Sequence, residues 1–143
     1  MIIYTTFDVK MPVFPKRIIS SWIKEISEKY QKKVGNISYI FCSDEKILEM
    51  NKEYLSHDYF TDIITFDYTS NNRISGDIFI SIDTVLSNSI FFNVPYDKEL
   101  FRVMIHGILH LCAFNDNTKE KRIEMRNSEN DALNILYTAY IQE

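Results

Sequence analysis

The longest mostly apolar stretch of this chain, residues 101–114, constrains its fold more than any other feature. It carries two histidines and an arginine, and it is too short to cross a bilayer. Its apolar members include Val103, Ile105, Ile108, Leu109 and Leu111. We therefore expect a buried helix over about 97–114, in the C-terminal third of a globular protein.

Strand-like and helix-like segments alternate along the 143 residues. Hydrophobic spacing and turn residues predict strands at 2–7, 36–42, 62–68 and 76–82, and helices at 16–34, 43–55, 83–91, 97–114 and 119–140. A helix joins the first two strands, which favours a parallel pair, and a short polar loop joins the last two, which favours an antiparallel pair. The prediction is an α/β (α+β) fold: one domain over 1–143, with a mixed four-stranded sheet and about five helices.

Turn and capping residues refine the expected boundaries. Gly35 follows the first helix and is expected to adopt the left-handed conformation that ends it. Ser43 and Asp83 are expected to cap the second and third helices. Tyr54 is expected to face inward from the second helix.

Composition and charge limit the partners and the compartment. The net charge of −4 gives no overall basic surface, so an RNA substrate would need a local basic patch and metal-to-phosphate contact. Cys42 and Cys112 lie in apolar runs without a CxxC spacing, which predicts buried free thiols and no disulfide partner. The N-terminal residues carry no secretory signal and no membrane segment is apparent, so a cytoplasmic location is expected.

Two of the three histidines form the pattern His106-Gly-Ile-Leu-His110. Residues four apart share one helix face, so two imidazoles can bind one ion from one helix. Asp116 follows just past the expected end of this helix, where a turn can return its carboxylate to the same face. The pattern predicts a His₂Asp metal site with an open position, as catalytic sites have.

Other interpretations of this pattern remain open. Two histidines at this spacing are often solvated or capped side chains, although the apolar flanks speak against solvation here. Gly107 has two interpretations: it makes room for backbone or substrate to lie close to the helix, or it allows a tight packing contact of the helix. The glutamate of HExxH metalloproteases is absent, which disfavours a peptidase and leaves the general base to the ion's water, the substrate or another segment.

At this point the sequence resembles the YbeY family of endoribonucleases. The family signature H-G-x-L-H-L-x-G-Y-D-H corresponds to HGILHLCAFND at 106–116. Three further blocks agree in the same order: TDIITF at 61–66, which NKEY at 51–54 precedes, GDIFIS at 76–81, and an M-x-x-x-E pattern from Met125 to Glu129. The combination is far more specific than any single block.

The resemblance implies a metal-dependent endoribonuclease that cuts single-stranded RNA in 16S rRNA 3′-end maturation and ribosome quality control. It implies ribosomal RNA and small-subunit components as partners, and one divalent ion, with zinc favoured, on His106, His110 and Asp116. Glu129 is expected to orient a metal-bound imidazole. The expected state is a monomer.

Three departures from the family pattern bear on the site. Asp116 replaces the third histidine, which keeps a competent ligand but opens the choice of metal to manganese or nickel. Ala113 replaces a turn glycine, and Asn115 is expected to supply the left-handed residue instead. Leu55 replaces an arginine, with His57 as a candidate stand-in.

Substrate contacts are expected from His57, Asp62 and Arg73. Asp62 begins a strand, His57 lies in a polar loop, and Arg73 adds local positive charge. Two other functions stay open: a non-catalytic metal-binding ribosome-assembly factor, and a metal-dependent hydrolase of another substrate.

Overall fold

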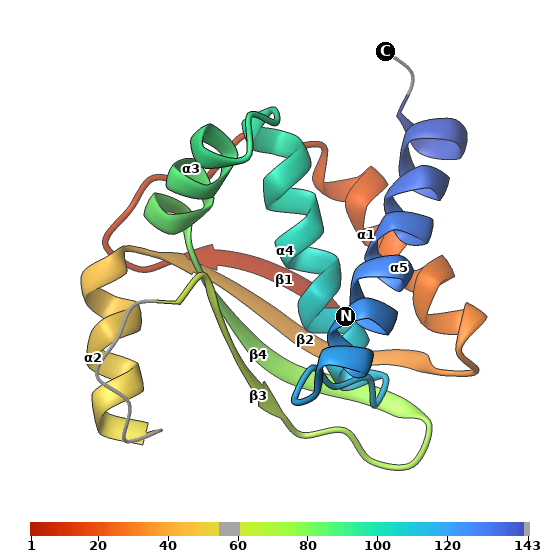
Figure 1. Cartoon of the computed structure of the whole chain (residues 1–143). Helices are drawn as coiled ribbons and strands as arrows, with labels where there is room; N and C mark the ends of the chain where they lie inside the picture. Colours follow the sequence, from red (N-terminus) through yellow and green to blue (C-terminus); the bar gives the residue numbers. More distant parts are fainter. Residues whose placement is uncertain (55–60, 142–143) are drawn as a thin grey trace.

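One mixed sheet organises the computed structural model, which describes residues 1–54 and 61–141 (Figure 1). The strands are β1 (Ile2–Thr6), β2 (Lys33–Cys42), β3 (Ile63–Asp67) and β4 (Arg73–Ser81). The helices are α1 (Lys16–Lys29), α2 (Asp44–Tyr54), α3 (Ile82–Phe91), α4 (Tyr96–Leu111), α5 (Lys119–Ile135) and the short π-helix η1 (Leu136–Tyr140). The strand order is β1-β2-β4-β3, with β3 antiparallel to β4 and the other neighbours parallel. The predicted mixed four-stranded sheet with five helices is confirmed.

The main core lies on the sheet face that α1, α4 and α5 cover. Two long-range hydrogen bonds fix these layers, because each buried polar tip needs a partner. The Tyr39 hydroxyl donates to the Met104 carbonyl (2.9 Å), and the Trp22 indole donates to the Ala132 carbonyl (2.8 Å). A smaller cluster with Ile47 lies on the other face, beneath α2. The predicted buried helix, α4, therefore lies between the sheet and α5.

The end of α1 differs from the prediction. The helix stops at Lys29 and β2 begins at Lys33, because the chain there pairs with β4, and this tertiary pairing overrides helix propensity. Gly35 is a residue of β2 beside an irregularity of the ladder and has no positive φ. The left-handed residue is Gln31, with φ of 59°.

The caps are partly as expected. Ser43 accepts from the Lys46 N–H (3.2 Å) and caps α2. Ser81, not Asp83, caps α3, by accepting from the N–H of Thr84 (3.2 Å). The carboxylate of Asp83 instead accepts from the first N–H of α2 (3.0 Å).

One further expectation about the helices is wrong. The side chain of Tyr54 is exposed, because the inward face of α2 is supplied by Ile47 and Met50. The last helical segment runs to Tyr140, as expected, with π geometry from Leu136 onward. No helix among the described residues is long and apolar enough to cross a membrane.

Candidate metal centre

Helix α4 places His106 and His110 side by side at the edge of the core. Most of the helix is buried, and Gly107 lets it lie close to the sheet, since a Cβ there would lie 3.1 Å from the side chains of Ile63 and Ile78. The two histidines, one helical turn apart, are only partly buried. The apolar residues of α4 thus face the core, and its imidazoles remain reachable by a ligand.

A tight turn after α4 brings the third candidate ligand back. Ala113 adopts φ of 76°, its N–H bonds the His110 carbonyl (3.0 Å), and the Phe114 N–H bonds the Leu109 carbonyl (3.0 Å). These two bonds form a Schellman motif, which reverses the chain direction. The expectation that Asn115 supplies the left-handed residue is wrong, because the turn falls two residues earlier.

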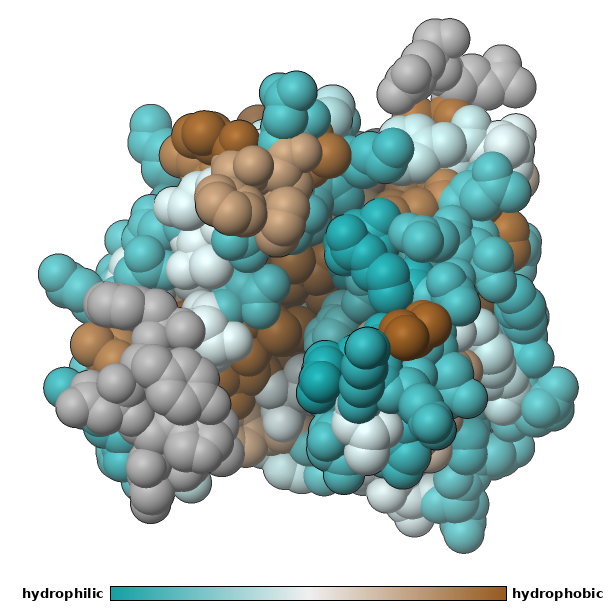
Figure 2. Space-filling model, viewed as in Figure 1, coloured by the Kyte–Doolittle hydropathy of each residue, from teal (hydrophilic) through white to brown (hydrophobic). Residues whose placement is uncertain are grey.

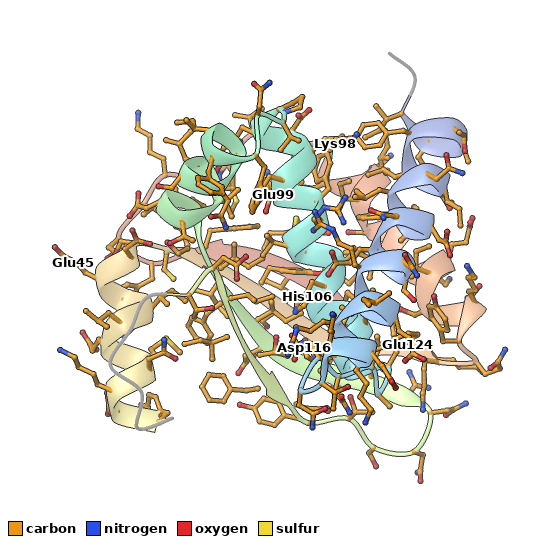
Figure 3. The ribbon with its side chains drawn as sticks, viewed as in Figure 1. Glu45, Lys98, Glu99, His106, Asp116 and Glu124 are labelled. Atoms are coloured by element: carbon orange, nitrogen blue, oxygen red, sulfur yellow. The ribbon has the colours of Figure 1, made fainter. Side chains whose placement is uncertain are left out.

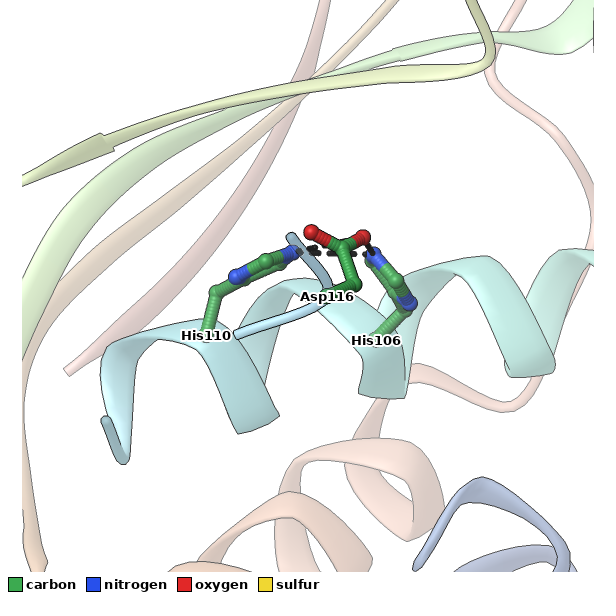
Figure 4. Close-up of side chains that lie close together, drawn as sticks. All are labelled: His106, His110 and Asp116. Carbon is green, nitrogen blue, oxygen red and sulfur yellow. Dashed lines mark hydrogen bonds and ion pairs between the residues drawn. The ribbon is translucent and has the colours of Figure 1, made fainter. Parts of the chain in front are cut away.

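Three acceptor atoms of these residues converge (Figure 4). The Nε2 atoms of His106 and His110 are 3.0 Å apart, and they lie 3.5 and 3.6 Å from Oδ2 of Asp116. Bond lengths of about 2.0–2.2 Å to a tetrahedral zinc ion separate two ligand atoms by about 3.4 Å. The three spacings therefore fit one ion of that size with each residue as a single ligand.

The outer nitrogens fix which ring atoms face this point. Nδ1 of His110 lies 3.1 Å from the carbonyl of Phe114, which can only accept, so Nδ1 carries the proton. Nδ1 of His106 lies 2.6 Å from Oε2 of Glu129 and donates to that carboxylate. Both Nε2 atoms are thereby left as acceptors facing a third acceptor, and a positive charge is needed between them. A divalent ion supplies it, as does a proton on His106.

The surroundings shift the pKa values of the two histidines in opposite directions. Burial alone would lower the pKa of His106, but the hydrogen bond and charge of Glu129, with the charges of two aspartates, raise it. Burial and the neighbouring His106 lower the pKa of His110. Of the two histidines, His106 therefore binds a proton more readily than His110.

A cleft of about 350 Å³ opens beside His106 and Asp116. Its other lining residues are Asp62, Asn88, Phe92, Glu99, Arg102, Val103, Arg122, Met125, Arg126 and Glu129. Figure 2 shows this hollow with an apolar floor, between the hydrophobic end of α3 and the hydrophilic side chains of α5. Candidate metal ligands and candidate substrate contacts thus share one cavity.

Charges in the cleft are partly paired. Arg102 donates to Glu129 (3.0 Å) and to the Asn130 side chain (2.8 Å), and Arg126 lies 3.7 Å from Glu129. Arg122 donates to the backbone carbonyl of Asp116 (3.4 Å). Within the part of the chain that the structure describes, Arg122 has no carboxylate at ion-pair distance, so its charge is available to a ligand.

Two carboxyl groups of the cleft are poorly hydrated. Burial raises the pKa of Asp62, which precedes β3, and burial likewise raises the pKa of Glu99 on α4. Figure 3 shows Glu99 and His106 on the same helix, with Asp116 beside His106. Either carboxylate is a proton acceptor of the kind that the HGILH pattern does not contain.

The other predicted site residues lie in different places. Asp62 and Glu129 line the cleft. Arg73 does not: it lines a separate cavity with Met1 and Lys33, at the start of β4. His57 and Leu55 lie outside the described residues.

Sequence reasoning did not assign Glu99, Arg122, Arg126 or Phe92 to the site. Helical spacing carried a signal for the first three. Glu99 lies on α4 at intervals of three or four residues from Arg102, His106 and His110, and Arg122 and Arg126 lie on α5 at such intervals from Glu129. Phe92 carried no such signal, because it follows the last turn of α3.

The fold and the site together define a class: small α/β proteins in which two histidines of a buried helix and a carboxylate that follows it are candidate metal ligands. The family model described as Endoribonuclease YbeY matches residues 6–137. The chain belongs to the YbeY family.

Similar proteins cover nearly the whole chain. Endoribonuclease YbeY of Parabacteroides distasonis is 57% identical over 135 residues, which are 94% of this chain and 95% of that protein. The Phocaeicola vulgatus protein of the same name is 58% identical, over 95% of this chain and 99% of its own. The solution structure of TM1509 from Thermotoga maritima matches with a TM-score of 0.62 and 26% identity, over 94% of this chain and 90% of that one.

Proposed function

We propose that this protein is a metal-dependent endoribonuclease of ribosomal RNA maturation, which cuts single-stranded RNA near the 3′ end of 16S rRNA. The observation that carries the proposal is the convergence of Nε2 of His106, Nε2 of His110 and Oδ2 of Asp116 on one point. Family membership supplies the RNA substrate, since the relatives are named endoribonucleases. That name does not favour a non-catalytic assembly factor or another substrate.

The three candidate ligands would bind the ion, and neighbouring groups orient them and bind the phosphate. A divalent ion bound there would polarise a phosphoryl oxygen and lower the pKa of a coordinated water. Glu129 and the Phe114 carbonyl hold the two imidazoles so that each Nε2 is free to bind such an ion. Arg122, anchored on the carbonyl of Asp116, presents its remaining guanidinium donors to a phosphate.

Proton transfer falls to a carboxylate of the cleft. Asp62 and Glu99 are the candidates, because both line the cavity and burial raises the pKa of both groups. The RNA's own 2′-hydroxyl or a water can be the nucleophile. Attack by the 2′-hydroxyl leaves a 2′,3′-cyclic phosphate, whereas attack by water does not, so the product ends distinguish the two.

Zinc is the proposed ion. The two imidazole nitrogens and the spacing of the ligand atoms suit zinc, although the carboxylate of Asp116 also suits manganese or nickel. We further propose that residues 1–143 form one domain that acts as a monomer in the cytoplasm. Small-subunit ribosomal components are the proposed partners. Such partners compensate for the net charge of −4, which weakens binding to free RNA.

The direct test is cleavage of an unstructured RNA and of the matched duplex, with and without a chelator. We expect metal-dependent cleavage of the single strand only, and a loss of at least about a hundredfold for Asp116→Asn, which weakens one ligand. Arg122→Ala should lower cleavage about tenfold or more, and Arg17→Ala, at an exposed position of α1, should not. Cleavage that survives chelation and Asp116→Asn would refute the proposal.

A further inference from the structure

An exposed phenylalanine forms one wall of the cleft. Phe92 follows the last residue of α3, is 54% exposed, and lines the same cavity as His106. Its neighbour Phe91 is 82% exposed and does not line that cavity, although the two rings contact each other at 5.1 Å. Figure 2 shows the hydrophobic end of α3 overhanging the hollow. Of these two adjacent aromatic residues, only Phe92 lines the cavity.

A hydrogen-bonded turn defines the backbone at Phe92. The N–H of Asn93, which has φ of 56°, bonds the Ile90 carbonyl (3.2 Å), and the N–H of Val94 bonds the Ser89 carbonyl (3.0 Å). These bonds form a Schellman motif with Phe92 as its C-cap residue. Helix α4 starts immediately afterwards, at Tyr96. The backbone at Phe92 therefore does not have to be ordered when a base stacks on the ring, which reduces the entropy lost on binding.

We propose that Phe92 stacks on an unpaired base of the RNA whose phosphate lies at the metal centre, and so selects single strands. This inference rests on the proposed endoribonuclease function. Aromatic side chains stack on bases of any sequence when these are unpaired, whereas bases in a duplex present no free face. The cavity volume of about 350 Å³ lies in the range of small-ligand sites.

The rest of the cleft suits a nucleotide in this orientation. Asn88 lies one helical turn before Phe92, lines the same cavity, and carries an amide that can bond a base edge. Arg122 and Arg126 come from α5, on the side of the cleft opposite α3, and carry the positive charge that a phosphate requires. A base between α3 and α4 and a phosphate beside α5 would thus each meet matching chemistry.

Tryptophan fluorescence tests the contact without catalysis. The chain has a single tryptophan, Trp22, which is fully buried, so Phe92→Trp and Phe91→Trp each add one exposed reporter. The probe is a 2′-O-methyl oligoadenylate, which has no 2′-hydroxyl nucleophile; its full length is checked after each titration, because attack by water does not need that hydroxyl. We expect the probe to quench the new fluorescence of Phe92→Trp saturably and that of Phe91→Trp little. Equal quenching of both variants, or none in Phe92→Trp, would overturn the inference.

Cleavage kinetics separate stacking from a structural role. Phe92→Ala should raise KM for single-stranded RNA about tenfold or more with kcat little changed, while Phe91→Ala leaves both near wild type and Phe92→Tyr restores most of the loss. If the wild type cleaves RNA and Phe92→Ala behaves like Phe91→Ala, the stacking inference fails and the proposed function stands. If the wild type neither binds nor cleaves RNA, both fail.

Discussion

Glu129 is the residue on which the arrangement of the metal centre most depends. Its carboxylate accepts from Nδ1 of His106 (2.6 Å) and from Arg102 (3.0 Å), and its side chain is 6% exposed. A buried carboxylate is stable only with such partners. One acidic residue of α5 therefore orients a ligand of α4 and ties the two helices together.

Replacing Glu129 by glutamine tests this role. The amide keeps an acceptor for Nδ1–H but loses the charge, so we expect zinc affinity to fall about tenfold or more. Calorimetric zinc titration measures the change. The matched control is Glu124→Gln, the same substitution at an exposed position of α5, which should keep wild-type affinity. An unchanged affinity for Glu129→Gln would contradict the assigned role.

Ala113 carries a conformational cost within the turn that returns Asp116. A left-handed alanine costs about 1–2 kcal/mol, whereas glycine adopts this conformation freely but loses more entropy on folding. With φ of 76° at this position, Ala113→Gly should raise the free energy of unfolding by about 0.5–1 kcal/mol, measured by urea denaturation. Ala132→Gly, inside α5, should have the opposite effect. Destabilisation by Ala113→Gly would count against the turn.

At the scale of elements, the order and pairing of strands and helices could be predicted, but several boundaries could not. The hydrophobic spacing of α4 and the short loop between β3 and β4 are local signals, and both predictions are confirmed. The start of β2 at Lys33 depends on pairing with β4, which lies about 40 residues further along the chain. Such long-range contacts leave no local pattern.

Some residues of the candidate site could be predicted from a motif, and others could not. His106, His110 and Asp116 carry a motif, and the structure brings all three together. Arg122 and Phe92 reach the cleft only because α3 and α5 pack on either side of α4. The sequence predicts Arg73 as a substrate contact, but its position at the start of β4 places it in another cavity. Packing, not residue type, decides which side chains share the site.

Gly107 sets the distance between α4 and the sheet. A methyl group there would lie 3.1 Å from Ile63 and from two atoms of the fully buried Ile78, and a branched side chain on a central strand cannot retreat. Gly107→Ala gains about 1 kcal/mol of helix propensity but overpacks by about 1–3 kcal/mol, so a net loss of about 1 kcal/mol is expected. Asn127→Ala, exposed on α5, is the control and should be near neutral. If Gly107→Ala instead raised the free energy of unfolding, α4 would not pack as tightly against Ile63 and Ile78 as described.

At the scale of the molecule, both thiols belong to the core. Cys42 and Cys112 are buried and free, as predicted. Burial raises the pKa of Cys42 to about 12 and that of Cys112 to about 11, against about 8.5 in an unfolded chain. As pH rises above the unfolded value, only the unfolded state loses these protons, which favours unfolding.

This linkage gives a pH prediction. The stability that the neutral thiols contribute is fully present below about pH 8.5 and is lost as pH rises through the folded pKa values. The wild type should therefore lose stability over this alkaline range more steeply than the double variant Cys42→Ala, Cys112→Ala, in urea unfolding at matched pH values. Iodoacetamide at pH 8 should modify neither thiol of the native protein. Equal slopes with rapid alkylation would contradict the burial of both groups.

At the scale of the whole molecule, three residues that can hold one metal ion lie beside a cleft of about 350 Å³, and their role as ligands has a direct test. The measurement is the metal content of the purified protein by elemental analysis, for wild type and His110→Ala, with ribonuclease activity assayed on the same samples. His110 supplies one of the three converging atoms, and its loss removes a ligand. We predict about one divalent ion per chain in the wild type, with metal and activity lost together in the variant. A wild type that binds no metal even after addition of zinc or manganese, or a variant that keeps both metal and activity, would contradict the account.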